Sequence, residues 1–141
     1  MMDTINERLS KFSSELRFED IPPEVLDHLK RVMLDCYGCG LFGSTTPWMR
    51  IYRDVLESLT DRNEATIWGT DRKTSVIEAM MLNGSAINSF ELDDTHTDGI
   101  IHVSTGVLGC ITAFAEKMGN LSGKDFLTAA VLAYEISCRV A

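Results

Sequence analysis

The sequence has 141 residues, of which 45% are hydrophobic and 24% are charged, and its formal net charge is −8. A chain of this length and composition can form one globular domain with a buried core. The acidic balance speaks against nucleic-acid binding, which uses clusters of Lys and Arg. No apolar run is long enough to span a membrane, so we expect a single domain that binds neither nucleic acid nor membrane.

The first 20 residues are polar and acidic and lack the apolar segment of a secretory signal. Cys36 and Cys39 form a CxxC pair inside an apolar segment, and no second pair accompanies them. Buried thiols are therefore more expected than a zinc or redox site. These features favour a cytoplasmic protein.

Apolar residues that recur at steps of three and four predict helices over residues 4–16, 22–41 and 47–59. Pro22 and Pro23 suit the first turn of the second helix. The apolar residues of the third helix are expected to face the core: Trp48, Ile51, Tyr52, Val55 and Leu59.

Residues 65–70, ATIWGT, are the one strand-like run, and they are too short to define a sheet alone. Two further helices are expected over residues 103–117 and 123–140, with Gly119 as a C-terminal cap and Ser122 or Gly123 opening the next helix. The last helix has no Gly, Asn or Pro to close it, so we expect a chain truncated at its C-terminus. The predicted fold class is all-α, a helical bundle over residues 1–141.

The residues with the most chemical potential lie in residues 83–106, NGSAINSFELDDTHTDGIIHVSTG. Its apolar spacing predicts that the helix beginning near Val76 continues to Asp94, with Glu91 and Asp94 near one face. A turn then returns the chain to His102.

The helix that follows this turn is expected to be capped by Ser104 or Thr105. Free N–H groups and the positive end of the helix dipole at residues 104–106 suit an anion such as a substrate carboxylate. On the last helix, Glu135 and Arg139 are four residues apart, which allows an ion pair.

The acidic stretch allows three interpretations. It can be a solvated acidic helix end with a paired histidine. It can be a Mg²⁺–diphosphate site, because Asp93, Asp94 and Asp98 form DDxxxD, although no second acidic motif and no neighbouring basic pair accompany it. It can also support acid–base chemistry, with His102 and a carboxylate sharing protons. The motif alone does not choose among them.

The order and spacing of several segments over nearly the whole chain resemble the N-terminal part of the MmgE/PrpD family. That family includes 2-methylcitrate dehydratase, cis-aconitate decarboxylase and iminodisuccinate epimerase. Glu91 and Val103 depart from the family pattern, which usually has Asp and Pro there. The segments that carry the resemblance are IPPEVLDHLKRVMLDCYGCGLFGS, ATIWGTDRKTSVIEAMMLNG, NGSAINSFELDDTH, the IH at residues 101–102 and FLTAAVLAYEISCRV.

The resemblance implies a cofactor-independent, metal-free lyase or isomerase. It would act on di- or tricarboxylic acids by proton transfer next to a carboxylate, with dehydration, decarboxylation or epimerisation as the outcome. His102 would be the general acid or base, Asp94 or Glu91 would orient it or share its proton, and Thr95 would hydrogen-bond the substrate. Further substrate-binding candidates are Asp93, His96, Ser104 and Thr105.

We also expect a homodimer. The resemblance places the lysines that neutralise the substrate beyond residue 141, so the 141-residue chain alone should be inactive. The main alternative is a non-catalytic helical dimerisation or scaffold fragment.

Overall fold

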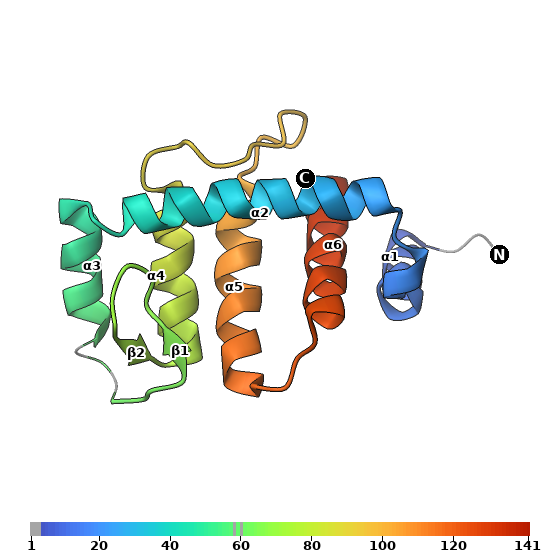
Figure 1. Cartoon of the computed structure of the whole chain (residues 1–141). Coiled ribbons are helices and arrows are strands. Elements are labelled where there is room, and N and C mark those ends of the chain that lie inside the picture. The colour runs from blue at the N-terminus through green and yellow to red at the C-terminus, as the bar shows by residue number, and fades with distance from the viewer. Residues whose placement is uncertain (1–3, 58, 60) are drawn as a thin grey trace.

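The computed structural model describes residues 4–57, 59 and 61–141. Its longest helix, α2, runs across the ends of four further helices, α3 to α6, which follow one another in a row (Figure 1). Helix α1 lies beyond α6, at the N-terminal end of α2 (Figure 1), and the short 3-10 helix η1 contacts α6. The helices span Ile5–Glu15 (α1), Phe18–Asp20 (η1), Pro23–Gly43 (α2), Pro47–Glu57 (α3), Val76–Asn88 (α4), Val103–Met118 (α5) and Gly123–Val140 (α6).

The expected all-α fold is confirmed, with one small sheet beside it. Strand β1 (Ala65–Thr66) pairs antiparallel with β2 (Lys73–Thr74), and Ala65 lies opposite Thr74. Gly69, in the link between them, has a φ of 74°, a conformation that glycine adopts without strain. The strand-like run therefore forms only a two-residue ladder.

The main core lies where α2 crosses α5 and α6. Cys36 and Leu29 of α2 are buried against Leu108 of α5 and Val131 of α6. Burial of such side chains away from water is the main force that holds helices together. The core thus fixes α4 and α5, the two helices that flank residues 89–102.

A second core cluster under α3 corrects the expected stripe of that helix. Met49 and Leu56 are buried against α4, and Tyr52 packs against the same cluster as predicted. The other residues of the predicted stripe are exposed, namely Trp48, Ile51, Val55 and Leu59. The helix is therefore rotated relative to the prediction. Its predicted C-terminal turn was also too long, because α3 ends at Glu57; residues 58 and 60 lie outside the described residues.

Glycines allow α4 to lie unusually close to its neighbours. A Cβ atom on Gly43 of α2 would lie 1.9 Å from the carbonyl oxygen of Ala86. A Cβ atom on Gly109 of α5 would lie 2.8 Å from the backbone nitrogen of Gly84. Interhelical contacts this short leave no room for a side chain.

The predicted C-terminal cap of α5 and the predicted N-terminal cap of α6 are both confirmed. Gly119 ends α5 with a φ of 69°. Ser122 begins α6, and its side chain accepts a hydrogen bond from the backbone N–H of Asp125.

The prediction that the helix beginning near Val76 continues to Asp94 was wrong, because α4 ends at Asn88. Phe90 leaves the helix and packs against Phe42 and Trp48, with ring centroids 4.7 and 5.6 Å apart. These contacts come from segments distant in the sequence, and they override the helical spacing. Residues 89–102 instead form a loop that runs past α2 to the start of α5 (Figure 1).

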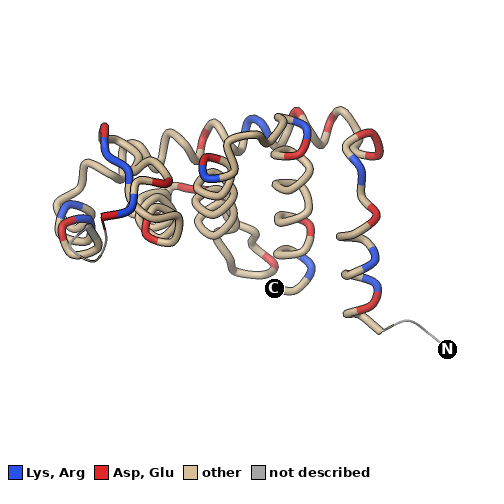
Figure 2. Tube along the Cα trace, turned by 90° about the horizontal axis from the view of Figure 1, so that it is seen from below, with Lys and Arg blue, Asp and Glu red and all other residues tan. Residues whose placement is uncertain are grey.

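Positions of Asp and Glu are interspersed with positions of Lys and Arg along the trace (Figure 2). None of the helices in the described part of the chain has both the length and the apolar character needed to cross a bilayer. All four cysteines are free thiols.

Candidate functional site

His102 stands at the start of α5 between two carboxylates. It is the N-cap residue, but its side chain makes no capping hydrogen bond. Its Nε2 atom lies 3.3 Å from Glu91 Oε2, and its Nδ1 atom lies 3.2 Å from Asp93 Oδ1. The structure therefore brings together His102 and Glu91, as expected, and adds Asp93 as the second carboxylate.

Asp93 is the anchored partner of this histidine. Its side chain is fully buried and accepts hydrogen bonds from Asn88 Nδ2 at 3.1 Å and Thr105 Oγ1 at 2.9 Å. His102 Nδ1 is buried and near enough to Asp93 for an ion pair, but within the described part of the chain it has no aligned hydrogen-bond partner. A buried carboxylate held in this way is a fixed support for an imidazole ring.

Glu91 approaches the other ring nitrogen from the solvent side. Its side chain is 72% exposed, and its backbone has a φ of 55°, which is uncommon for a residue other than glycine. Such strained conformations persist where the surrounding structure fixes them, and they cluster at functional sites.

Asp94 contacts a different set of groups. Its Oδ1 atom accepts a hydrogen bond from the backbone N–H of Ser104 at 3.0 Å, and the thiol of Cys36 lies 3.5 Å from the same oxygen. Among the described residues, no hydrogen bond or ion pair joins Asp94 to His102. The N–H of Ser104, expected to be free for a substrate carboxylate, is occupied by Asp94.

The sequence predicted that Ser104 or Thr105 caps α5. This prediction was wrong, because His102 is the N-cap residue and neither hydroxyl makes the capping hydrogen bond. Ser104 is fully buried, and its hydroxyl forms a short hydrogen bond with the hydroxyl of Tyr134. The hydroxyl of Thr105 donates to Asp93. Both side chains tie the first turn of α5 to neighbouring segments.

The thiol and the phenol near Asp94 stay protonated at neutral pH. Burial raises the pKa of Cys36 to about 11, and the nearby Asp94 carboxylate also disfavours the thiolate. Burial likewise raises the pKa of Tyr134 well above its ordinary value. Both groups are therefore hydrogen-bond donors rather than bases.

His96 closes the turn that returns the chain to His102. The backbones of His96 and Ile101 exchange two hydrogen bonds, at 2.9 and 3.3 Å. His96 Nδ1 also accepts a hydrogen bond from the N–H of Gly99 at 3.0 Å. In this structure His96 thus serves to fix the loop.

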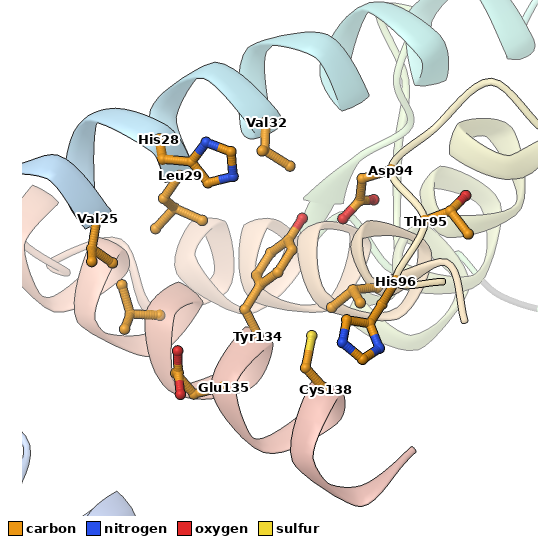
Figure 3. A pocket seen from close by; sticks show the side chains of 12 residues that line it. Val25, His28, Leu29, Val32, Asp94, Thr95, His96, Tyr134, Glu135 and Cys138 are labelled. Atoms are coloured by element: carbon orange, nitrogen blue, oxygen red, sulfur yellow. The ribbon is translucent and has the colours of Figure 1, made fainter. Parts of the chain in front are cut away.

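A cavity of about 300 Å³ lies between α2, α6 and the loop (Figure 3). The loop contributes Asp94, Thr95 and His96, whereas Glu91 and His102 are not among the lining residues. The structure thus divides the predicted site residues into a pair of carboxylates around His102 and a second set that faces this cavity. The other lining residues are Val25, His28, Leu29, Val32, Val103, Val131, Tyr134, Glu135 and Cys138.

His28 and Cys138 also line this cavity, although neither was predicted as a site residue. His28 shares a helix face with Val25 and Val32, three and four residues away, which was the available signal. The predicted ion pair on α6 is confirmed, because Arg139 Nε donates to Glu135 Oε2 at 3.0 Å.

Among the described residues, no group of three or more His, Cys, Asp or Glu side chains is arranged to hold a metal ion. Asp93 and Asp94, two members of the DDxxxD pattern, have different hydrogen-bond partners. This geometry does not favour the Mg²⁺–diphosphate interpretation.

Residues 7–141 match the family model described as the MmgE/PrpD N-terminal domain. The chain therefore belongs to the MmgE/PrpD family.

Three curated relatives align with nearly all of this chain. It is 32% identical to a cis-aconitate decarboxylase-like protein of Aspergillus oryzae, over 96% of this chain and 30% of that protein. It is 30% identical to the cis-aconitate decarboxylase of Homo sapiens, over 99% of this chain and 30% of that protein. It is 29% identical to the cis-aconitate decarboxylase of Aspergillus terreus, over 96% of this chain and 29% of that protein. The chain thus spans about 30% of the length of the curated relatives it matches.

Proposed function

We propose that this chain supplies the proton-transferring histidine of an MmgE/PrpD lyase that acts on a small tricarboxylic acid, with cis-aconitate as the first substrate to test. The relatives' names support the substrate class. The observation that carries the proposal is the position of His102, with one ring nitrogen beside Glu91 and the other beside Asp93. A histidine supported in this way suits general acid–base chemistry.

The reaction needs one proton from the protein. When the bond between carbon and CO₂ breaks, its electron pair stays on the substrate, where the neighbouring double bond and carboxylate delocalise it. CO₂ leaves as this bond breaks, and a proton then adds to the carbanion carbon of the substrate. Protonated His102 has a donor on each ring nitrogen, so it can stay bound to buried Asp93 through Nδ1 while Nε2 delivers the proton.

The remaining predicted residues receive separate proposed roles. Glu91 is exposed beside Nε2 and so can receive or return the proton of His102. Thr95 keeps the proposed hydrogen bond to the substrate, because its one hydrogen bond within the described residues is a long one, 3.5 Å to the carbonyl oxygen of Asp93. Asp93 takes the orienting role that the resemblance implied for Asp94 or Glu91.

A tricarboxylic acid also needs positive charge around it, because fixed opposite charge stabilises a reacting anion in a water-poor site. Residues 89–102 contain no Lys or Arg. We therefore propose that cationic groups outside this chain complete the site and that the chain alone does not turn over substrate.

The test is an assay of the full-length protein that carries this chain, with cis-aconitate, citrate, 2-methylcitrate and iminodisuccinate. In D₂O, decarboxylation of cis-aconitate should release CO₂ and place one deuterium on a product carbon, as seen by NMR. Absence of turnover of all four acids by folded protein would contradict the proposal.

A non-catalytic association module is the second candidate. It is favoured by an exposed cluster of aromatic rings, because Phe42, Trp48 and Phe90 pack together yet remain 56%, 51% and 39% exposed. Exposed apolar patches often mark interaction surfaces. Sedimentation of Trp48→Ser beside the wild-type protein tests this candidate and the proposed homodimer, since loss of association with retained turnover would separate the two functions.

A further inference from the structure

The geometry points to Asp94 as a positioning residue that caps α5 from outside the helix and so leaves the side chain of His102 free for the reaction. This inference rests on the proposed role of His102. It separates the two neighbouring aspartates by task, since Asp93 contacts the imidazole and Asp94 fixes the helix from which the imidazole projects.

The first step of the argument is the unusual N-terminus of α5. The N-cap residue normally accepts a hydrogen bond from the second or third N–H of the helix through its own side chain. His102 holds that place without making the bond. Asp94 makes it instead, because its Oδ1 atom accepts from the N–H of Ser104, the second residue of the helix, at 3.0 Å. A carboxylate there also matches the positive end of the helix dipole.

The second step is that the carboxylate of Asp94 is itself held by a hydrogen bond from α2. Cys36, which is fully buried in α2, approaches the same Oδ1 atom at 3.5 Å. The pKa of this thiol is raised by burial, so the thiol remains a donor. The cap is therefore connected to the core of the molecule.

The third step is that the side chain of Ser104 is fixed by α6. Its hydroxyl hydrogen-bonds the hydroxyl of Tyr134 in α6, and Ser104 itself is fully buried. Four segments, namely α2, the loop, α5 and α6, thus meet at the first turn of α5 through polar contacts. A hydrogen-bonded network of buried and partly buried groups rigidifies its surroundings.

The consequence concerns the geometry of His102. If the first turn of α5 frays, the imidazole loses its fixed position between Glu91 and Asp93. Small misplacements of a reacting group can lower a rate by about two orders of magnitude. The charge of Asp94 is not required for this role, since Asn caps helices about as well as Asp.

The test compares Asp94→Ala with the conservative variant Asp94→Asn in the full-length protein. Asp98→Asn, which changes an exposed carboxylate of the same loop, is the matched control. We expect Asp94→Ala to lower kcat about 10- to 100-fold with KM within about threefold of wild type. Asp94→Asn should stay within about threefold of wild type in both constants. The control should behave as wild type.

A second readout does not depend on catalysis. Diethyl pyrocarbonate acylates accessible imidazoles, and peptide mass spectrometry gives the rate at each histidine. In Asp94→Ala the rate at His102 should rise about fivefold, the change in population of a frayed helix start when a typical cap is lost. The rate at exposed His28 should not change, and Asp94→Asn should match wild type.

Two results would overturn the inference. Wild-type behaviour of Asp94→Ala in both readouts would show that the cap is not needed. An equal loss of kcat in Asp94→Asn and Asp94→Ala, with unchanged acylation of His102, would show that the Asp94 charge acts on the substrate itself.

If Asp94→Ala does not fold, Asp94→Asn alone decides, because a loss of kcat above about tenfold in the folded Asp94→Asn variant contradicts positioning. If wild-type protein decarboxylates nothing, the proposed function fails, and the acylation rates still test the cap.

Discussion

The buried carboxylate of Asp93 and the imidazole of His102 lie 3.2 Å apart across the start of α5, Oδ1 to Nδ1. The same carboxylate accepts a hydrogen bond from Thr105, one turn further along the helix. One side chain thus fixes both the backbone turn and the ring that projects from it. This arrangement leads to predictions for stability as well as for activity.

Asp93→Ala should lower the free energy of unfolding by about 2 kcal/mol, because it leaves the partly buried polar groups of Asn88 and Thr105 without an acceptor. Asp98→Ala, an exposed site in the same loop, should change it by less than about 0.5 kcal/mol. Urea unfolding measures both. Equal stability of the two variants would refute the anchoring role of Asp93.

Glu91 should lower the stability of the protein through its backbone conformation while its carboxylate supports the activity of His102. Its φ of 55° is unfavourable for Glu but tolerated by Asn, so Glu91→Asn should leave the free energy of unfolding unchanged or raise it by about 0.5 kcal/mol. The variant loses the carboxylate beside His102, and kcat should fall about tenfold.

Ile100 provides the matched control for Glu91→Asn. Its φ is 52° and its side chain is 87% exposed. Ile100→Asn should also relieve strain, without loss of kcat. A loss of kcat in Ile100→Asn equal to that in Glu91→Asn would mean that loop conformation, rather than the carboxylate, sets the rate.

The glycines of α5 should respond to alanine according to their neighbours. Gly109→Ala places a Cβ atom 2.8 Å from the backbone of Gly84, so the free energy of unfolding should fall by about 2 kcal/mol. Gly106→Ala in the same helix meets nothing within 4 Å, and it should stabilise the protein by up to about 1 kcal/mol. Thermal unfolding of the pair is the measurement, and a destabilised Gly106→Ala would count against the described packing.

Glu78 should make stability depend on pH in the acid range. Burial disfavours its carboxylate, but hydrogen bonds from Thr74 and Ser75 outweigh burial and lower its pKa below the ordinary 4.5. The unfolded state then binds the proton more readily, so this stabilisation is present above pH 4.5 and is lost as the pH falls through the folded-state pKa. Urea unfolding from pH 3 to 7 should show a weaker pH dependence in Glu78→Gln, and an unchanged dependence would exclude this role.

Local signals in the sequence predicted most helices and their caps. Gly119 and Ser122 mark the ends of α5 and α6 because capping depends on residues only a few positions apart. The end of α4 could not be predicted in this way, because Phe90 follows the helical spacing but packs against rings of α2 and α3. Long-range contacts decided that boundary.

The sequence predicted only part of the site, because some of its residues meet through long-range contacts. The pairing of Glu91 with His102 was expected from the family resemblance and from a turn that returns the chain to His102, and this turn is present although the helix ends at Asn88. The choice between Asp93 and Asp94 did not, because adjacent residues in a loop have no periodicity that tells which one faces the histidine. The cavity residues His28 and Cys138 come from α2 and α6, and only the packing of these helices brings them near the loop.

The most direct measurement is the rate of CO₂ release from cis-aconitate by the full-length protein with His102→Asn, beside Asp98→Asn, which changes an exposed side chain of the same loop, as the control. We expect His102→Asn to lower kcat by about 10²- to 10⁴-fold, the contribution of a positioned general acid or base, and Asp98→Asn to retain wild-type kcat. Turnover by His102→Asn within about threefold of wild type would contradict the central role of His102.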